Sequence, residues 1–409
     1  MSRVFKVFYV LLIIVCVLYP LKMIVAPITI RHIFSLFMFV FCLFLGFKID
    51  KYIILYLAFL FFLGISSVIT GFLGTYVNKL FGTYLPAIAV WMSTYLLVKK
   101  YKGIGVLVWL FVGIGVLNAI ITIGQFFGLD FVNTLFERFQ FATDEVFLEK
   151  TGRRLTAEGL VIPGLFNSVL NGYFLSASAL LILYNKKCNL IINIVLWLIV
   201  VVASFMAQER AGFFLAIAFS AYIIVQYFFS KSRGTGIVMT SILVITLIIV
   251  ASTYLDFLFS SDFRFAKGFE SDGRSELRNV AWRYLFNNPL GGVYEFFDAN
   301  NRPPHNYFTN AFLYGGIFGG VSLIVLLILQ VVRILPFVVH IPKTDNDKWA
   351  FIWGLMYIDL SINSMVHNAS LVTGQLLFFY ICWSAFQALS TLEEKMKTEN
   401  LETTVPLST

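Results

Sequence analysis

Charged residues are scarce in this sequence: they make up 13% of its 409 residues, whereas 59% are hydrophobic. A soluble domain usually carries about 25% charged residues, so the composition excludes an ordinary soluble protein. The apolar residues gather in stretches of roughly 17–25, the length of a helix that crosses about 30 Å of hydrocarbon. Backbone polar groups must be satisfied inside a membrane, which favours helices, and stretches such as 237–251 lack the alternation of β-barrel strands.

Cysteine is also scarce, and the chain contains only Cys16, Cys42, Cys188 and Cys382. Three lie in apolar stretches and Cys188 lies in a basic turn, so nothing indicates an extracytoplasmic disulfide or a CxxC metal site. The sequence lacks an H-E-x-x-H motif, a Walker loop and a Gly-rich dinucleotide motif. We therefore expect neither a metal nor a cofactor. No small-residue cleavage site follows residues 1–20, which are expected to remain as the first helix.

The apolar stretches predict an all-α polytopic membrane protein with about twelve transmembrane helices. The expected helices cover residues 5–21, 33–47, 52–70, 80–98, 104–127, 160–184, 190–207, 211–229, 237–255, 306–335, 349–366 and 371–389. With both termini in the cytoplasm, every inner connection is basic, and the short outer turns hold only Lys22, Arg31, Lys79 and Arg210. This inward bias explains the net charge of +8 without a nucleic-acid partner.

The expected topology divides the chain into segments. They are the N-terminal transmembrane helices (1–127), an outer interfacial segment (128–159), central transmembrane helices (160–255), a large outer catalytic loop (256–305), C-terminal transmembrane helices (306–390) and a cytoplasmic tail (391–409), expected to be disordered after residue 393. The interfacial segment places Phe131, Leu135, Phe136 and Phe139 on one helical face, as in a helix lying on a membrane. Long loops escape the insertion rule, so the cations of the large loop call for a functional explanation.

One helix is predicted inside the large outer loop, from a cap at Ser271 or Asp272 to about Asn287. The N-P-L-G-G motif that follows would end it. Its expected apolar side consists of Leu277, Ala281, Tyr284 and Leu285. Arg274 and Arg278 lie one turn apart beside that apolar side, where they can reach a pocket near the membrane surface. The alternative is a helix that only faces solvent or lipid headgroups.

The next predicted helix begins after the sequence P-P-H-N, in which two prolines force an extended approach. His305 would lie at the outer mouth of this helix, with Asn306 as its cap. A helix N-terminus disfavours positive charge, so the imidazole is expected to be neutral and able to accept a proton from a hydroxyl. The alternative is a histidine that only bonds locally. Two small-xxx-small pairs predict close helix packing: Gly315 with Gly319, and Gly316 with Gly320.

Further charged residues fall at or inside the predicted helices. Arg210 can bind a phosphate in bidentate fashion, or form an interfacial ion pair with Glu209. Arg153 and Arg154 precede the expected helix 160–184, where the alternative role is that of snorkelling anchors. Asp359 lies within a predicted span, where a carboxylate is costly. We expect it to pair with an outer-leaflet arginine, with proton or acceptor handling as the alternative.

An ordered set of motifs covers residues 153–335. It consists of R-L-T-A-E-G from Arg154, Q-E-R-A-G around Arg210, G-R-(x7)-W from Gly273 to Trp282, N-P-L-G-G from Asn288, P-H-N from Pro304 and G-G-I-F-G-G up to Gly320. This set resembles the O-antigen ligase and polymerase superfamily of bacterial envelopes. The loop-to-helix part that ends in His305, Asn306 and the glycines is its most specific portion. Glu209 stands where the family often has a small hydroxyl residue.

The resemblance implies a fold like that of the GT-C class of membrane glycosyltransferases. It implies a donor oligosaccharide on undecaprenyl pyrophosphate and a metal-independent, inverting transfer to a sugar hydroxyl on the outer side. In this chain it implies that Arg210 and Arg274 hold the pyrophosphate with help from Arg154, and that His305 orients or deprotonates the acceptor. Further substrate-binding candidates are Arg153, Arg278, Glu209 and Asn306.

We therefore expect a repeat-unit polymerase for O-antigen or capsule in the bacterial inner membrane, with its active site facing the periplasm. Its expected partners are a lipid-linked donor and acceptor, membrane lipids, a chain-length regulator and a flippase. The alternative is an O-antigen ligase, which transfers finished glycan to a lipid A core. A third possibility is a transporter or flippase, which predicts polar residues at the bilayer midplane and paired discontinuous helices.

Overall fold

The computed structural model describes residues 2–17, 30–129, 131–132, 164–165, 169–185, 189–207, 210–242, 244–245, 274–300, 306–366 and 377–404. These ranges contain helices joined by turns and no strand. The prediction of an all-α protein is therefore confirmed. Only Phe131 and Val132 of the predicted interfacial helix fall within the described residues, and both are helical.

The described helices are numbered in their order along the chain. The first half contains α1 (Ser2–Val17), α2 (Ile30–Phe44), α3 (Lys51–Ile69), α4 (Leu73–Lys79), the π-helical turn η1 (Leu80–Tyr84), α5 (Leu85–Lys99) and α6 (Ile104–Phe126). The second half contains α9 (Val169–Tyr184), α10 (Leu190–Met206), α11 (Arg210–Lys231), α13 (Arg274–Asn287), α14 (Val293–Asn300), α15 (Tyr307–Val339), α16 (Asp345–Val366) and α17 (Leu377–Thr404).

Several helices have the length and composition of membrane spans. Within the described ranges, five meet both criteria: Lys51–Ile69, Leu73–Lys99, Ile104–Phe126, Ala211–Lys231 and Tyr307–Val339. Shorter apolar helices accompany them at Ile30–Phe44, Asn171–Tyr184 and Leu190–Met206. The chain is therefore an all-α membrane protein.

The three largest differences from the predicted helix boundaries are at Leu73, Val169 and Thr404. The helix expected at 80–98 begins at Leu73. Lys79 was expected in an outer turn before this helix, but it is itself helical and the chain continues through the π turn η1 into α5. The helix expected from residue 160 begins at Val169, because Gly164 forms a turn with φ +59°. The last helix continues to Thr404, past the expected end at 389.

The extension of α17 has a physical cause in its polar residues. Glu394 forms a salt bridge of 3.1 Å with Arg333 of α15, and Glu393 accepts a 2.7 Å hydrogen bond from Thr344. Lys395 pairs with Glu399 one turn later, at 3.5 Å. These ion pairs and this hydrogen bond therefore stabilise a helix where disorder was expected.

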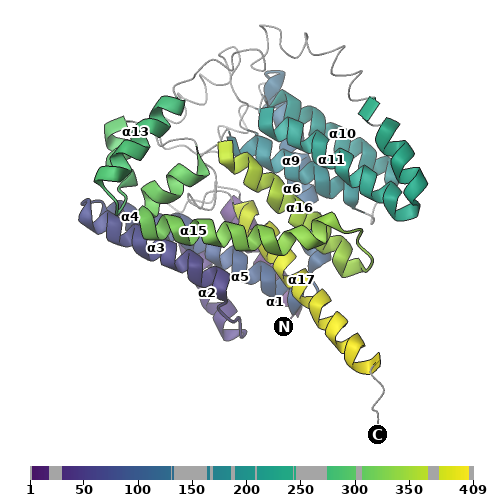
Figure 1. The fold of residues 1–409 in the computed structure, drawn as a ribbon, viewed down its shortest axis with the longest axis horizontal. Helices are drawn as coiled ribbons and strands as arrows, with labels where there is room; N and C mark the ends of the chain where they lie inside the picture. Colours follow the sequence, from purple (N-terminus) through teal and green to yellow (C-terminus); the bar gives the residue numbers. More distant parts are fainter. Residues whose placement is uncertain are drawn as a thin grey trace.

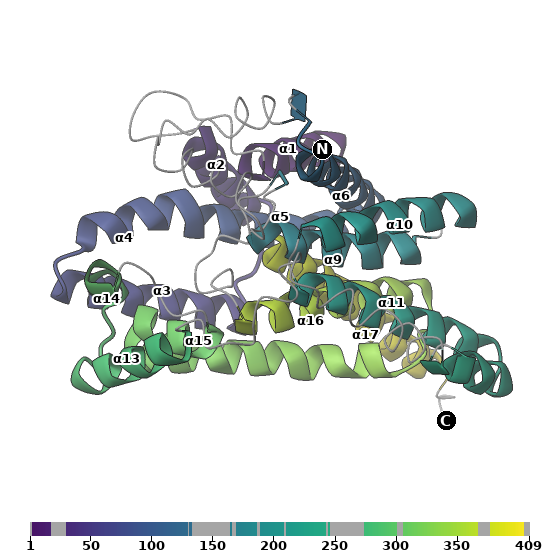
Figure 2. The same cartoon turned by 90° about the horizontal axis from the view of Figure 1, so that it is seen from above.

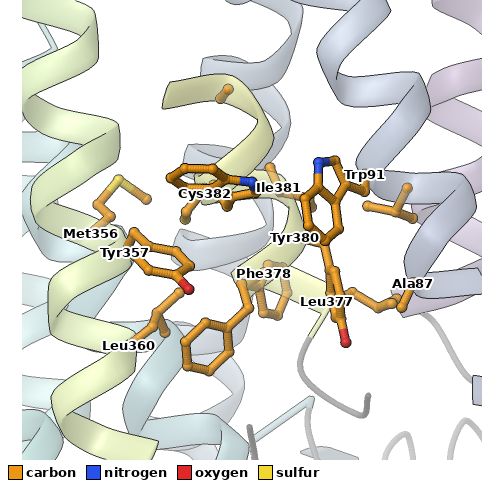
Figure 3. Packing of buried hydrophobic residues seen from close by; sticks show 14 of the residues in the cluster. Ala87, Trp91, Met356, Tyr357, Leu360, Leu377, Phe378, Tyr380, Ile381 and Cys382 are labelled. Carbon is orange, nitrogen blue, oxygen red and sulfur yellow. The ribbon is translucent and has the colours of Figure 1, made fainter. Parts of the chain in front are cut away.

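Aromatic side chains fill the centre of the bundle between α5, α16 and α17 (Figure 3). Trp91 of α5, Tyr357 of α16 and Tyr380 of α17 are all fully buried. The hydroxyl groups of Tyr380 and Tyr56 lie 2.6 Å apart, which joins α17 to α3. A buried polar group is stable when it is hydrogen-bonded, so this pair fixes the register of the two helices.

Apolar side chains also cover the outside of the bundle. On α10 the exposed hydrophobic residues include Leu190, Ile191, Ile192, Ile194, Val195, Leu198 and Val202. Such a surface would aggregate in water and is the surface expected toward lipid. Helices α3 and α15 pack side by side along the length of the molecule, and α4, α13 and α14 lie together at the end away from the C-terminus (Figures 1 and 2).

Candidate functional site

Two glycine motifs interlock where α13 meets α15. Gly316 interrupts the helical conformation of α15 with φ +63° and ψ −165°. The loop that follows α13 occupies this break: the Gly292 N–H donates to the Leu313 carbonyl at 3.0 Å, and the Ile317 N–H donates to the Pro289 carbonyl at 2.9 Å. The backbone groups freed by the break are thus satisfied by the N-P-L-G-G loop.

Both motifs need glycine because their backbones touch. A Cβ atom on Gly316 would lie 2.5 Å from the Leu290 carbonyl carbon, and one on Gly291 would lie 2.8 Å from the Gly316 nitrogen. Each of these two glycines also has positive φ, which other residues rarely adopt. The predicted packing role is confirmed for Gly315 and Gly319, which contact Phe59 of α3. For Gly316 that role is wrong, because this residue breaks the helix.

Helix α13 lies against α15 with the predicted apolar side. Leu277, Ala281 and Leu285 are buried, and the Trp282 ring lies 5.6 Å from the Phe312 ring of α15. The helix ends at Asn287, as predicted. Its exposed residues include Glu276, Arg278, Arg283 and Phe286. The guanidinium of Arg278 is therefore available to a ligand at this end of the molecule.

Arg274 is the first residue of α13. Its side chain lies outside the described part of the structure. The position nevertheless fixes the backbone from which the guanidinium extends, one turn before Arg278.

Tyr284 connects α13 to α14. Its hydroxyl donates a 2.6 Å hydrogen bond to Glu295 Oε2. Burial raises the pKa of Tyr284 above its usual value, and the neighbouring Glu295 carboxylate raises it further. The phenol therefore stays protonated at neutral pH and remains the donor. This bond braces the two short helices that flank the interlocked loop.

Asn306 caps α15, as predicted. Its side-chain oxygen accepts a 3.1 Å hydrogen bond from the Thr309 N–H, and its amide donates to the Met365 carbonyl of α16 at 3.5 Å. The start of α15 is therefore held against the last turn of α16. His305 immediately precedes this cap and lies outside the described residues.

Arg210 begins α11. The structure does not describe the side chain of Arg210. Glu209, Arg153 and Arg154 also lie outside the described residues. Two residues into α11, Gly212 meets the backbone of α9, and an added Cβ would lie 2.6 Å from the Gly172 carbonyl oxygen. The next residue of α9, Tyr173, donates a 3.0 Å hydrogen bond to the Asn363 carbonyl of α16. The starts of α9 and α11 are thereby linked to the end of α16.

A polar cluster that the sequence reasoning missed fixes the turn before α9. Asn118 of α6 accepts a 2.7 Å hydrogen bond from the Leu165 N–H, and Gln125 accepts one of 2.9 Å from the Gly164 N–H. Asn118 also donates to Asn171 of α9 at 2.7 Å. Polar side chains at 118, 122 and 125 in an otherwise apolar helix were the available signal. This polar cluster anchors the chain shortly after Arg153 and Arg154.

Asp359 lies fully buried between α16 and α9. Its Oδ1 atom accepts hydrogen bonds from Ser176 at 3.0 Å and from the Asn363 amide at 3.3 Å. The expected arginine partner is not found among the described residues, in which Oδ2 has no hydrogen-bond partner. Neutral hydrogen-bond donors, the Ser176 hydroxyl and the Asn363 amide, therefore stabilise Asp359 in place of the expected arginine.

The helices whose ends carry the candidate residues are thus linked in series by backbone contacts and hydrogen bonds. Helices α13 and α15 carry Arg278 and Asn306, and α16 and α9 connect α15 to α11. Within the described ranges, no three His, Cys, Asp or Glu side chains form a metal-binding group. No protein-family model matches the chain, and no curated protein matches it at a significant level.

Proposed function

We propose that this protein is a lipid-linked-donor glycosyltransferase that polymerises the repeat units of an O-antigen or a capsular polysaccharide. One observation carries the proposal. The loop of residues 289–292 fills the break at Gly316, and this contact seats the arginine-bearing helix α13 beside the capped start of α15. The resemblance assigns the pyrophosphate to Arg274 of α13 together with Arg210 of α11, and the acceptor hydroxyl to His305, which precedes α15.

The chemistry explains why arginines are needed. A hydroxyl oxygen of the acceptor sugar attacks the anomeric carbon of the donor, while the bond from that carbon to the pyrophosphate oxygen breaks. The proton goes to the His305 imidazole, and the electron pair leaves on the pyrophosphate. Arg210 and Arg274, with help from Arg154, would stabilise the charge that develops there. Arginine suits this task because its planar fork matches phosphate oxygens and is always charged.

The setting of the reaction follows from the lipid carrier. A polyprenyl tail keeps the donor pyrophosphate at the membrane surface, so the cations must lie at the ends of transmembrane helices. We propose a GT-C-like arrangement of about twelve spans in the bacterial inner membrane, with both termini in the cytoplasm and the site facing the periplasm. A flippase that delivers the repeat unit and a chain-length regulator are the protein partners that this reaction requires.

A strain that lacks the gene tests this function. We expect its surface glycan to be reduced to a single repeat unit on the lipid A core, and a plasmid copy to restore long chains. Long lipid-linked chains that never reach the core would instead identify a ligase. Loss of all surface glycan, with single repeats trapped on the cytoplasmic leaflet, would identify a flippase and contradict the proposed transfer.

A further inference from the structure

Lys79 is a cation at the outer end of the bundle that the sequence reasoning treated only as part of a short turn. It is the last residue of α4, directly before the π turn η1, and its side chain is half-buried. Its ammonium nitrogen lies 5.0 Å from the centre of the Tyr294 ring and 6.0 Å from the centre of the Tyr314 ring. Helices α14 and α15 supply these rings.

No carboxylate balances the charge of Lys79 in the described ranges, where the salt bridges join other residues. Cation–π contacts hold the ammonium in place, but each is weak compared with a charge-assisted hydrogen bond. A charge that is partly withdrawn from water is stabilised by an anionic partner. The ammonium is therefore positioned for a negatively charged group that the protein does not provide.

Tyr294 gives a second, independent indication. The residue is 8% exposed, and its hydroxyl finds no hydrogen-bond partner in the described part of the chain. Burial raises the pKa of Tyr294 above its usual value, so the hydroxyl keeps its proton and needs an acceptor. A buried hydroxyl without an acceptor is destabilising. A bound anion would supply the missing acceptor.

The position of this pair agrees with a ligand that reaches it from the membrane surface. Helix α4 lies at the same end of the molecule as α13 and α14 (Figures 1 and 2). The π turn that follows Lys79 is a type of helix distortion often found at functional sites. Tyr294 belongs to α14, which is braced to the arginine-bearing α13 by the Tyr284–Glu295 hydrogen bond.

We propose that Lys79 and Tyr294 bind the phosphate of a second lipid-linked substrate, the acceptor of the growing chain. This inference rests on the proposed polymerase function and deepens it. A polymerase joins two molecules that each carry a lipid pyrophosphate, so it needs one set of cations for the donor and another for the acceptor. Lysine and a phenol can together donate several hydrogen bonds to one phosphate group.

Binding of undecaprenyl pyrophosphate without sugar tests the site separately from catalysis. The full-length protein in phosphatidylcholine nanodiscs should bind two molecules of this probe. We expect Lys79→Met and Tyr294→Phe each to weaken one of the two binding events by about tenfold, the effect of losing one charge-assisted hydrogen bond. Lys79→Arg, which keeps the charge, and Asn78→Ala, an exposed neighbour on α4, should retain both.

Three results would overturn the proposal: unchanged binding in Lys79→Met, equal weakening in Asn78→Ala, or displacement of the probe from this site by phosphatidylglycerol at the same concentration. The last result would identify an ordinary headgroup site. Because the measurement is of binding, its outcome is independent of catalysis. If Lys79→Met weakens binding of the probe but the wild-type protein forms no polymer, the polymerase function is refuted and the phosphate site is retained. If the wild-type protein forms polymer but Lys79→Met binds the probe as the wild type does, only the phosphate site is refuted.

Discussion

Single cations at helix ends decide whether the proposed transfer can occur. The pyrophosphate leaving group develops negative charge without a metal in the proposed reaction, and fixed guanidinium groups must stabilise it. Arg274 and Arg278 follow one another on consecutive turns of α13, whose buried face contacts α15. The same helix carries Arg283, which is exposed and provides a matched control.

Replacing Arg274 by alanine should abolish chain extension. Loss of one fixed donor to a developing oxyanion lowers a rate by about 100-fold or more. The measurement is the ladder of glycan lengths on a gel, made in a deletion strain that expresses each variant, with the amount of membrane-inserted protein determined by immunoblot. Arg283→Ala should give the wild-type ladder. A wild-type ladder from Arg274→Ala would remove this residue from the site.

At this scale the sequence predicted the helix cap and the exposed arginine but not every partner. Asn306 caps α15 because an Asn before an apolar run is a local signal. Asp359 has two partners: Asn363 is one turn away, but Ser176 is distant in the sequence, so no local pattern could have identified Ser176. The polar residues of α6 were a local signal, but the turn at Gly164 that they bind is distant in the sequence.

The element on which the site depends is the break in α15. Two motifs that lie some 25 residues apart in the chain meet there backbone to backbone, between Leu290 and Gly316. The contact leaves no room for a Cβ atom on Gly291 of the loop or on Gly316 of α15. The glycine spacing in the sequence predicted close helix packing, which holds for Gly315 and Gly319. The break itself was not predictable, because it requires the docked loop to satisfy its backbone.

Gly316→Ala should destabilise the protein. The new methyl group would meet the Leu290 carbonyl carbon at 2.5 Å, and φ of +63° disfavours alanine, so the combined penalty is about 2 kcal/mol or more. We expect a lower unfolding temperature of the detergent-purified variant, followed by fluorescence, and reduced chain extension.

Gly113→Ala is the matched control for this substitution. Gly113 lies inside α6 and an added Cβ would meet no atom within 4 Å. Alanine is preferred over glycine in a helix by up to about 1 kcal/mol, so this variant should be as stable as the wild type or slightly more stable. Equal unfolding temperatures for the two variants would show that α15 tolerates a side chain at the break.

At the scale of the whole molecule, the described ion pairs lie near one end of the helical bundle. The described salt bridges lie where α15, α16 and α17 approach the C-terminus, and they include Arg333–Glu394 and Lys348–Asp345. Helices α4, α13 and α14 lie at the opposite end (Figures 1 and 2). Hydropathy and the positive-inside rule predict from the sequence that these two ends lie on opposite sides of the membrane, because both are properties of segments and need no tertiary contacts.

The proposed reaction requires that the end of the molecule formed by α13 faces the outside of the cell membrane. In a variant whose four native cysteines are replaced by serine, one cysteine is introduced by Asn287→Cys at the end of α13 or by Thr398→Cys near the end of α17, both at exposed positions. A membrane-impermeant maleimide is then applied to intact spheroplasts. We expect Asn287→Cys to be labelled at once, whereas Thr398→Cys should be labelled only after the membrane is permeabilised. The reverse pattern would place the arginines of α13 in the cytoplasm and contradict the proposed function.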